Sequence, residues 1–264
     1  MVALLGVAIV IACAGGAYAV IDDGDPAGVT TAASTSTSTS TSTSTSTTLA
    51  TTTSNAAPVT TAPPRSAPTT AAPTTSSTHP HPARVVTTQS WVPYATVGAI
   101  ELHLPSDHVE AIGFHESAQD GAQEQTPIEG VVRWFTMGSR ERDTIDRGAA
   151  DIVVEPGREV RVPVTGTVKR AGTYTLYCDN VDQYAVIEPD SHPGWEVKVL
   201  HIQGLALTKG QRVQAGVTVL AAHARVLPFP SQVEEDTGLP AWPHVHVEVV
   251  DPSIIDRPTG PGCP

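Results

Sequence analysis

The sequence predicts an all-β domain at the C-terminal end of a longer chain, and three observations support this fold class. Short runs rich in Val, Ile and Tyr fill the second half of the 264-residue sequence. Gly, Pro, Asp and Asn separate these runs, as in strands that are joined by turns. Helical periodicity is nearly absent from the same region, apart from one predicted turn at 231–238. The pattern is therefore typical of a compact antiparallel β domain.

The first segment, residues 1–21, is apolar and carries no charge. Its length suits a membrane anchor as well as a secretory signal. Ala-Tyr-Ala at 17–19 fits a signal cleavage site, and Cys13 at the end of Val-Ile-Ala-Cys fits a lipidation site. The absence of Lys or Arg ahead of the apolar run argues against both signals. We expect an exported chain, either secreted or tethered to a membrane through this segment.

The second segment, residues 22–84, is dominated by Thr, Ser, Ala and Pro, and Ser and Thr alternate from Ser34 to Thr47. Such a segment cannot bury enough apolar surface to offset the entropy that ordering would cost. It therefore predicts a disordered stalk, which serves either as a plain spacer or as a carrier of sugars on its hydroxyl groups.

The rest of the chain, about 180 residues, suffices for one domain with a hydrophobic core. We divide it into a β extension at 85–130 and a main β domain at 131–264. Two strands are predicted within 97–117. Further strands are predicted at 150–154, 158–172, 173–178, 183–189, 195–202, 217–222 and 244–250.

The charge of the chain excludes one class of partner. The formal net charge is −12, and the only lysines are Lys169, Lys198 and Lys209. These residues form no basic stripe for a phosphate backbone, so nucleic acid is not an expected partner.

Cys178 and Cys263 are the two cysteines of the folded part. In an oxidising compartment they could pair, and closing so long a loop would contribute about 4 kcal/mol in the chain-entropy model. Two free thiols fit the sequence equally well.

The stretch WPHVHVEVVDP, residues 242–252, alternates between polar and apolar side chains. In a strand, His244, His246 and Glu248 therefore leave one face while the valines leave the other. Two imidazoles on one face suit a metal site in which one ring binds the ion and the other transfers a proton. Two solvent-facing histidines on a half-buried strand are the plain alternative.

Three separated segments resemble the M23 family of zinc peptidases (lysostaphin- and LytM-like), and they occur in the family's order. The segments are GAADIVVEPGREVRVPVTGTV, VKVLHIQGLALTKGQRVQAG and PHVHVEV, and the likeness runs from about Arg147 to Pro252. Members of this family are compact β domains that cut the peptide cross-bridges of bacterial peptidoglycan. The resemblance thus implies a Zn2+ hydrolase at the cell envelope whose partner is peptidoglycan or its cross-bridge peptides.

The resemblance also implies roles for single residues. Asp151 and His246 would bind the metal, while His201 and His244 would flank the attacking water. One of these two would act as general base and the other would stabilise the oxyanion. Zn2+ suits such a site because it lowers the pKa of a bound water to about 7 and polarises the scissile carbonyl. Glu248 either orients one of the histidines through a hydrogen bond or is a solvated carboxylate at the strand end.

One position departs from the family pattern. The first ligand of the family is a histidine four residues before the aspartate, and this chain has Arg147 there. A guanidinium has no lone pair to give to a metal. Arg147 could instead form an ion pair with Asp151 or Glu248 in place of the metal.

A third ligand must therefore come from elsewhere, and His115 is the candidate that we favour. The small Gly113 beside it would allow close approach of the segment that carries it. His223, His108 and His103 are weaker candidates, because they lie in more polar company or on the far side of a turn.

Two other functions fit parts of the sequence. A domain without metal could be an adaptor or activator that binds wall peptide or a partner wall hydrolase. PVTGTV and KGQRVQAGVTVL also resemble biotinyl- or lipoyl-carrier modules. Those modules carry a lysine at an exposed hairpin tip, where we expect none of the three lysines.

Overall fold

The computed structural model describes residues 81–257. The predicted apolar segment 1–21, the predicted stalk up to residue 80 and Cys263 lie outside the described residues. The described part is built almost wholly from strands, with one short 3-10 helix, η1 (Gln232–Asp236), so the prediction of an all-β fold is confirmed. The predicted turn at 231–238 is the site of η1. Among the described residues, no helix has the length and apolar character to cross a membrane.

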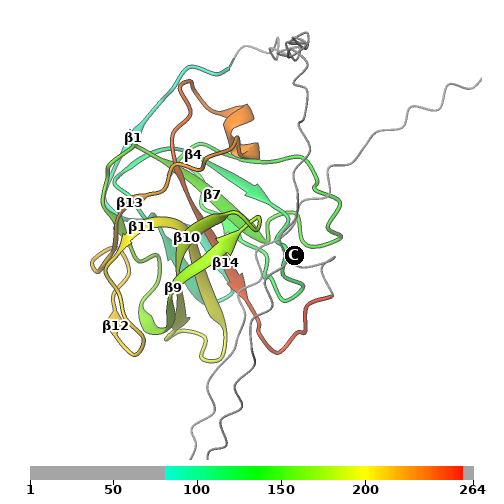
Figure 1. The fold of residues 1–264 in the computed structure, drawn as a ribbon, viewed down its shortest axis with the longest axis vertical. Helices are drawn as coiled ribbons and strands as arrows, with labels where there is room; N and C mark the ends of the chain where they lie inside the picture. The colour runs from blue at the N-terminus through cyan, green and yellow to red at the C-terminus, as the bar shows by residue number, and fades with distance from the viewer. Residues whose placement is uncertain (1–80, 258–264) are drawn as a thin grey trace, which may run out of the picture. The chain divides into compact units, whose positions relative to one another are not determined.

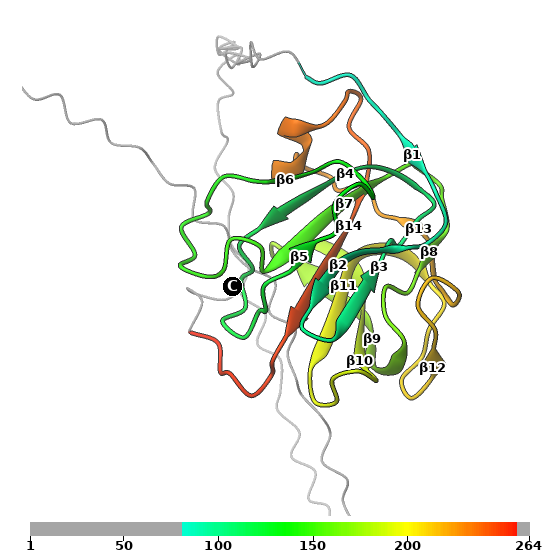
Figure 2. The ribbon, with the colours of Figure 1, turned by 180° about the vertical axis from the view of Figure 1, so that it is seen from behind.

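The strands form one large sheet, most of whose strands are labelled in Figure 1, and one small sheet, which is labelled in Figure 2. The small sheet has the order β3-β2-β5, and the large one has eleven strands, of which the central path is β1-β4-β7-β14-β11-β10-β9-β12. All pairs are antiparallel except β4 and β6. The strands of the first half are β1 (Thr87–Thr88), β2 (Pro93–Val97), β3 (Ile100–His103), β4 (His108–His115), β5 (Thr126–Pro127), β6 (Trp134–Thr136) and β7 (Ala149–Val154). Those of the second half are β8 (Val160–Arg161), β9 (Gly166–Leu176), β10 (Asn180–Pro189), β11 (Glu196–Leu205), β12 (Arg212–Val213), β13 (Val219–Ala224) and β14 (His244–Val250).

The hydrophobic core lies between the two sheets. Val245, Val247 and Val249 of β14 are fully buried in one cluster together with Ile100 and Leu102 of β3. Figure 2 shows β2 and β3 on the face of the molecule that is hidden in Figure 1. The two-residue period of β14 thus places its valines in the core and leaves its histidines on the opposite face.

The segment predicted as a β extension, 85–130, contributes to both sheets. It supplies β2, β3 and β5 to the small sheet, and it places β4 next to β7 in the large one. Gly113 of β4 is opposite Asp151 of β7, and Asp151 is opposite His246 of β14. The register of three neighbouring strands therefore brings the end of β4 to the histidine face of β14.

The close approach expected at Gly113 involves η1. A Cβ atom at this glycine would lie 3.0 Å from the side chain of Val233, in η1, and 3.1 Å from Met137. Val233 is itself buried in a small cluster with Met137 and Val153.

Two details of the predicted strands are wrong. The runs 158–172 and 173–178 were expected to be separate, whereas β9 crosses that boundary without a break and the interruption falls at 162–165. Pro163 lies in this interruption. Because proline has no backbone N–H to donate, it is better placed here than inside a strand ladder. The short strands β1, β2, β5, β6 and β12 were not predicted.

Candidate metal centre

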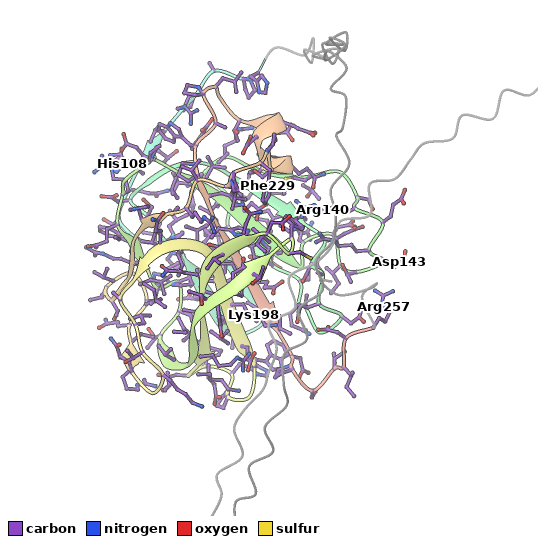
Figure 3. All side chains as sticks on the ribbon, viewed as in Figure 1. His108, Arg140, Asp143, Lys198, Phe229 and Arg257 are labelled. Atoms are coloured by element: carbon purple, nitrogen blue, oxygen red, sulfur yellow. The ribbon has the colours of Figure 1, made fainter. Side chains whose placement is uncertain are left out.

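The histidine face of the large sheet forms the floor of a cleft of about 550 Å³. Its lining includes two arginines, Arg140 and Arg142, which lie in the loop between β6 and β7. The apolar and aromatic lining residues are Leu176, Tyr177, Leu200, Leu227, Phe229 and Pro230. Arg140 and Phe229 are labelled in Figure 3. All five residues that the sequence favoured for the site, His115, Asp151, His201, His244 and His246, line this cleft.

Asp151, His115 and His246 form a compact set of donor atoms. The Oδ1 atom of Asp151 lies 3.2 Å from Nε2 of His115 and 2.8 Å from Nδ1 of His246. One ligand atom from each residue can be chosen so that all three lie within 4.8 Å of one another. Two imidazole nitrogens and a carboxylate oxygen are a donor set that suits Zn2+, and also Fe2+.

The hydrogen bonds of His115 show that this set fits a cation. The ring is 1% exposed, and its Nδ1 lies 2.7 Å from the carbonyl oxygen of Glu116, which can only accept. Burial lowers the pKa of His115, so the ring is neutral and Nδ1 carries its proton. The lone pair of Nε2 then faces a carboxylate oxygen, and Nε2 has no hydrogen-bond partner. Two electron-rich atoms at this distance repel one another, and a cation beside both would relieve the repulsion.

His246 presents its two nitrogens to two carboxylates. Nδ1 faces Asp151, while Nε2 lies 3.7 Å from Oε2 of Glu248. The same Glu248 oxygen accepts a hydrogen bond of 2.6 Å from the hydroxyl of Ser117. Glu248 is therefore a buried carboxylate beside a candidate ligand, and the solvated strand-end carboxylate, which was the other role that the sequence left open, is wrong.

Burial and neighbouring charges shift several pKa values in the centre. Burial opposes the protonation of His246, but the hydrogen bond to Asp151 and the nearby carboxylate of Glu248 outweigh this and raise its pKa to about 9. Burial also opposes the ionisation of Glu248, yet the nearby His246 ring brings its pKa to about 2. Burial lowers the pKa of His244 to about 3, so this ring is neutral near pH 7.

His201 and His244 lie beside the three candidate ligands. Their ring centroids are 5.0 Å apart, and the centroid of His201 is 5.8 Å from that of His246. Nε2 of His244 lies 3.8 Å from Oδ1 of Asp151, which is beyond hydrogen-bonding distance. Two imidazoles are thus available for proton transfer or hydrogen bonding next to the donor set.

His201 is placed by a β-bulge in β11. Gln183 of β10 pairs with Ile202, and Tyr184 pairs with Leu200. His201 is therefore an extra residue that has no paired residue in β10. Its φ of 62° lies in the left-handed region that side chains other than glycine rarely adopt. Such strained residues gather at functional sites.

Asp182 and Tyr174 are two residues of the site that sequence reasoning missed. The Nδ1–H group of His201 donates to Oδ2 of Asp182 at 2.7 Å, and the Tyr174 hydroxyl donates to the same oxygen at 2.8 Å. Burial opposes the ionisation of Asp182, but these contacts to His201 and Tyr174 lower its pKa. The predicted strand began at residue 183, whereas β10 begins at Asn180 and includes the aspartate.

Arg147 does not enter the centre. Its guanidinium pairs with Glu124, and its Nε donates to the carbonyl oxygen of Gln125 at 3.2 Å. The ion pair with Asp151 or Glu248 that the sequence suggested is therefore wrong. The register explains this, because Asp151 faces the cleft from within β7 whereas Arg147 precedes that strand.

A different arginine approaches the aspartate. Nη2 of Arg140 lies 3.8 Å from Oδ2 of Asp151, and its Nε donates to the side chain of Gln232. Glu116 holds the backbone of this loop by accepting hydrogen bonds from the N–H groups of Arg140 and Arg142 at 2.8 and 3.1 Å.

The weaker ligand candidates lie elsewhere. The ring of His103 contacts the carbonyl oxygen of Trp91, that of His108 contacts Asp107, and that of His223 contacts the carbonyl oxygen of Ala224. Cys178 is disulfide-bonded. Its predicted partner, Cys263, lies outside the described residues, so that pairing stays a prediction.

A comparison of the chain with models of known protein families found no match, and a comparison with curated proteins found none either.

Proposed function

We propose that this protein is a metal-dependent hydrolase that cuts peptide bonds, with Zn2+ held by His115, Asp151 and His246. The observation that carries the proposal is the unpartnered Nε2 of His115, whose lone pair faces a buried carboxylate oxygen 3.2 Å away. His115 supplies the ligand that Arg147 cannot, and this completes the usual count of three protein ligands. When bound, Zn2+ would act as a Lewis acid on the scissile carbonyl and lower the pKa of an attacking water to about 7.

The other histidines would handle the protons of the reaction. Hydrolysis adds water across the peptide C–N bond, so that the carbonyl carbon gains a hydroxyl and the leaving nitrogen gains a proton. A base must take the proton of the water and return it to that nitrogen. His201 and His244 line the same cleft, so one would serve as this base and the other would donate a hydrogen bond to the developing oxyanion.

The charges of the cleft favour an anionic peptide as substrate. Its charged lining residues among the described part of the chain are Arg140, Arg142, Asp151 and Glu248. These charges cancel, so a divalent cation would make the cleft positive although the chain as a whole is acidic. A positive cleft attracts a peptide that bears carboxylates.

The cell-wall assignment rests on the sequence. The likeness to M23 peptidases and the apolar segment and Thr/Ser tract ahead of the domain favour an exported protein at the bacterial envelope that acts on peptidoglycan peptides. A cleft lined by both apolar side chains and two arginines suits such a substrate.

Metal analysis and a cleavage assay test the proposal together. The full-length chain, purified without chelators, is expected to hold about one zinc ion and to release peptides from purified peptidoglycan, detected by mass spectrometry. His115→Ala should lose both properties, while His223→Ala, a matched change outside the cleft, should lose neither. Less than about a tenth of an equivalent of zinc in the unchanged protein would rule out the metal site, and bound iron would point to a different chemistry.

An adaptor that binds wall peptide without cutting it is the second candidate, because Arg140 lies 3.8 Å from the aspartate and could neutralise it in place of a metal. Peptidoglycan hydrolysis that disappears on His246→Ala would exclude an adaptor. A carrier module is less well supported, although Lys209 lies in an exposed turn where no lysine was expected. An intact mass without a biotinyl or lipoyl adduct would exclude it.

A further inference from the structure

Asp182 is a buried carboxylate that lies next to the candidate metal centre without belonging to it. Its side chain is fully shielded from solvent, and it sits directly opposite Tyr174 in the β9–β10 ladder. Oδ2 accepts the Tyr174 hydroxyl at 2.8 Å and the His201 ring at 2.7 Å, while Oδ1 accepts the backbone N–H of Gln183 at 2.8 Å. Arg225 adds a positive charge 3.6 Å from Oδ1. The carboxylate is therefore rigidly held, and both oxygens act as acceptors.

The arrangement determines which nitrogen of His201 carries a proton. An ionised carboxylate can only accept hydrogen bonds, so the ring nitrogen that contacts Asp182 must be the donor. The proton of a neutral His201 therefore belongs on Nδ1. Nε2 then keeps its lone pair, and it is the nitrogen left for the cleft that His201 lines. His244 receives no comparable constraint, since its Nε2 lies 3.8 Å from the Asp151 carboxylate, beyond hydrogen-bonding distance.

We propose that Asp182 is a positioning residue that holds the His201 imidazole in its Nδ1–H tautomer and orientation, and so makes His201, not His244, the base of the reaction. This inference rests on the proposed hydrolase function and assigns the two roles that function left open. The left-handed bulge at His201 fits the assignment. The bulge removes this residue from the ladder and turns its ring toward Asp182, and its unfavourable backbone conformation is maintained by the contacts that hold the ring.

The side-chain nitrogen resonances of His201 test the tautomer directly. They are assigned by their loss in His201→Gln, in the full-length protein with and without zinc. The expected spectrum shows a protonated Nδ1 and an unprotonated Nε2 in both forms. A wild-type spectrum with the proton on Nε2 would overturn the proposal without any variant. Because this measurement does not depend on cleavage, a protein that shows the expected tautomer but cuts no peptide would count against the hydrolase function alone.

Asp182→Asn tests the consequence for catalysis, with Asp190→Asn as the matched control. Asp190 pairs with Arg212 at the surface and does not line the cleft. Asp182→Asn should lower kcat by about 100- to 10,000-fold, the usual contribution of a general base, while KM changes by less than about threefold and the zinc content stays unchanged. The nitrogen spectrum should lose its single tautomer. Asp182→Ala provides a second variant, because the side-chain oxygen of an asparagine could still accept the Nδ1–H of His201. Unchanged kcat and tautomer in both Asp182 variants would reduce the aspartate to a structural role.

Discussion

Asp151 and Glu196 are carboxylates of equal burial, each 3% exposed, yet their surroundings differ completely. Arg170 holds Glu196 with two hydrogen bonds of 3.0 and 2.7 Å, and Nζ of Lys169 lies 3.1 Å away. Asp151 faces imidazoles at 2.8, 3.2 and 3.8 Å, and the nearest arginine nitrogen is 3.8 Å from its other oxygen.

The difference separates a structural carboxylate from a functional one. A buried charge is tolerated when its partners neutralise it and satisfy its lone pairs. Glu196 meets both conditions through permanent cations. Among the described residues, Asp151 has no such cation close by on an arginine or lysine; two of the imidazoles around it, those of His115 and His244, are neutral and offer lone pairs, an arrangement that becomes favourable when a metal ion joins it. The first carboxylate is expected to stabilise the fold and the second to serve the site.

Asp151→Asn should have the largest effect on metal binding. The zinc affinity should fall by more than about 100-fold, since even the loss of an outer partner costs 10- to 100-fold. Competition with a chromophoric chelator measures the affinity. A variant that binds zinc as tightly as the unchanged protein would contradict the distinction between the two carboxylates.

Glu196→Gln should give the opposite result. The free energy of unfolding should fall by about 2 kcal/mol, because two cations lose a charged hydrogen-bond partner. Arg170 and Lys169 are partly exposed and water screens them, which keeps the loss below that of a fully buried pair. Zinc content and peptide cleavage should equal those of the unchanged protein. Urea unfolding provides the test, and a fall in zinc content would show that the two regions are coupled.

The pH dependence of stability should also distinguish this pair. Burial opposes the ionisation of Glu196, but the hydrogen bonds from Arg170 and Lys169 lower its pKa below the ordinary value of 4.5. Its contribution to stability is therefore present above the ordinary pKa and is lost as the pH falls through the lowered value. Below about pH 4.5 the unfolding free energies of the unchanged protein and Glu196→Gln should converge. Parallel curves across the acid range would show that the ion pairs contribute nothing.

The fold class could be predicted because it depends on a local property. The two-residue period at 244–250 places Val245 and Val247 in the core whatever strands lie beside them. The break between β8 and β9 was misplaced, because the residues after Gly172 have the same strand-like composition as those before it. Short strands such as β5 could not be predicted, since two residues are too few to show an alternating pattern.

The site was harder to predict, because it depends on register. Asp151 and His246 were paired through the resemblance, and the structure shows them directly opposite one another in neighbouring strands. His115 could be suggested only as one histidine among several, since nothing local reveals that β4 adds to β7. Asp182 lay outside its predicted strand, and its role depends on a bulge that no sequence pattern marked.

Arg147→Ala should have the smallest effect of the changes considered, and it tests the departure that made the site look incomplete. The exposed pair with Glu124 is expected to contribute less than about 1 kcal/mol to the unfolding free energy. Because the arginine lies outside the cleft, its loss should leave zinc content and peptide cleavage unchanged. Arg147→His, which introduces the histidine of the M23 pattern, should not raise the zinc content either, since we expect His115 to supply the third ligand. A clear gain of zinc or activity in Arg147→His would mean that His115 does not fill the third ligand position.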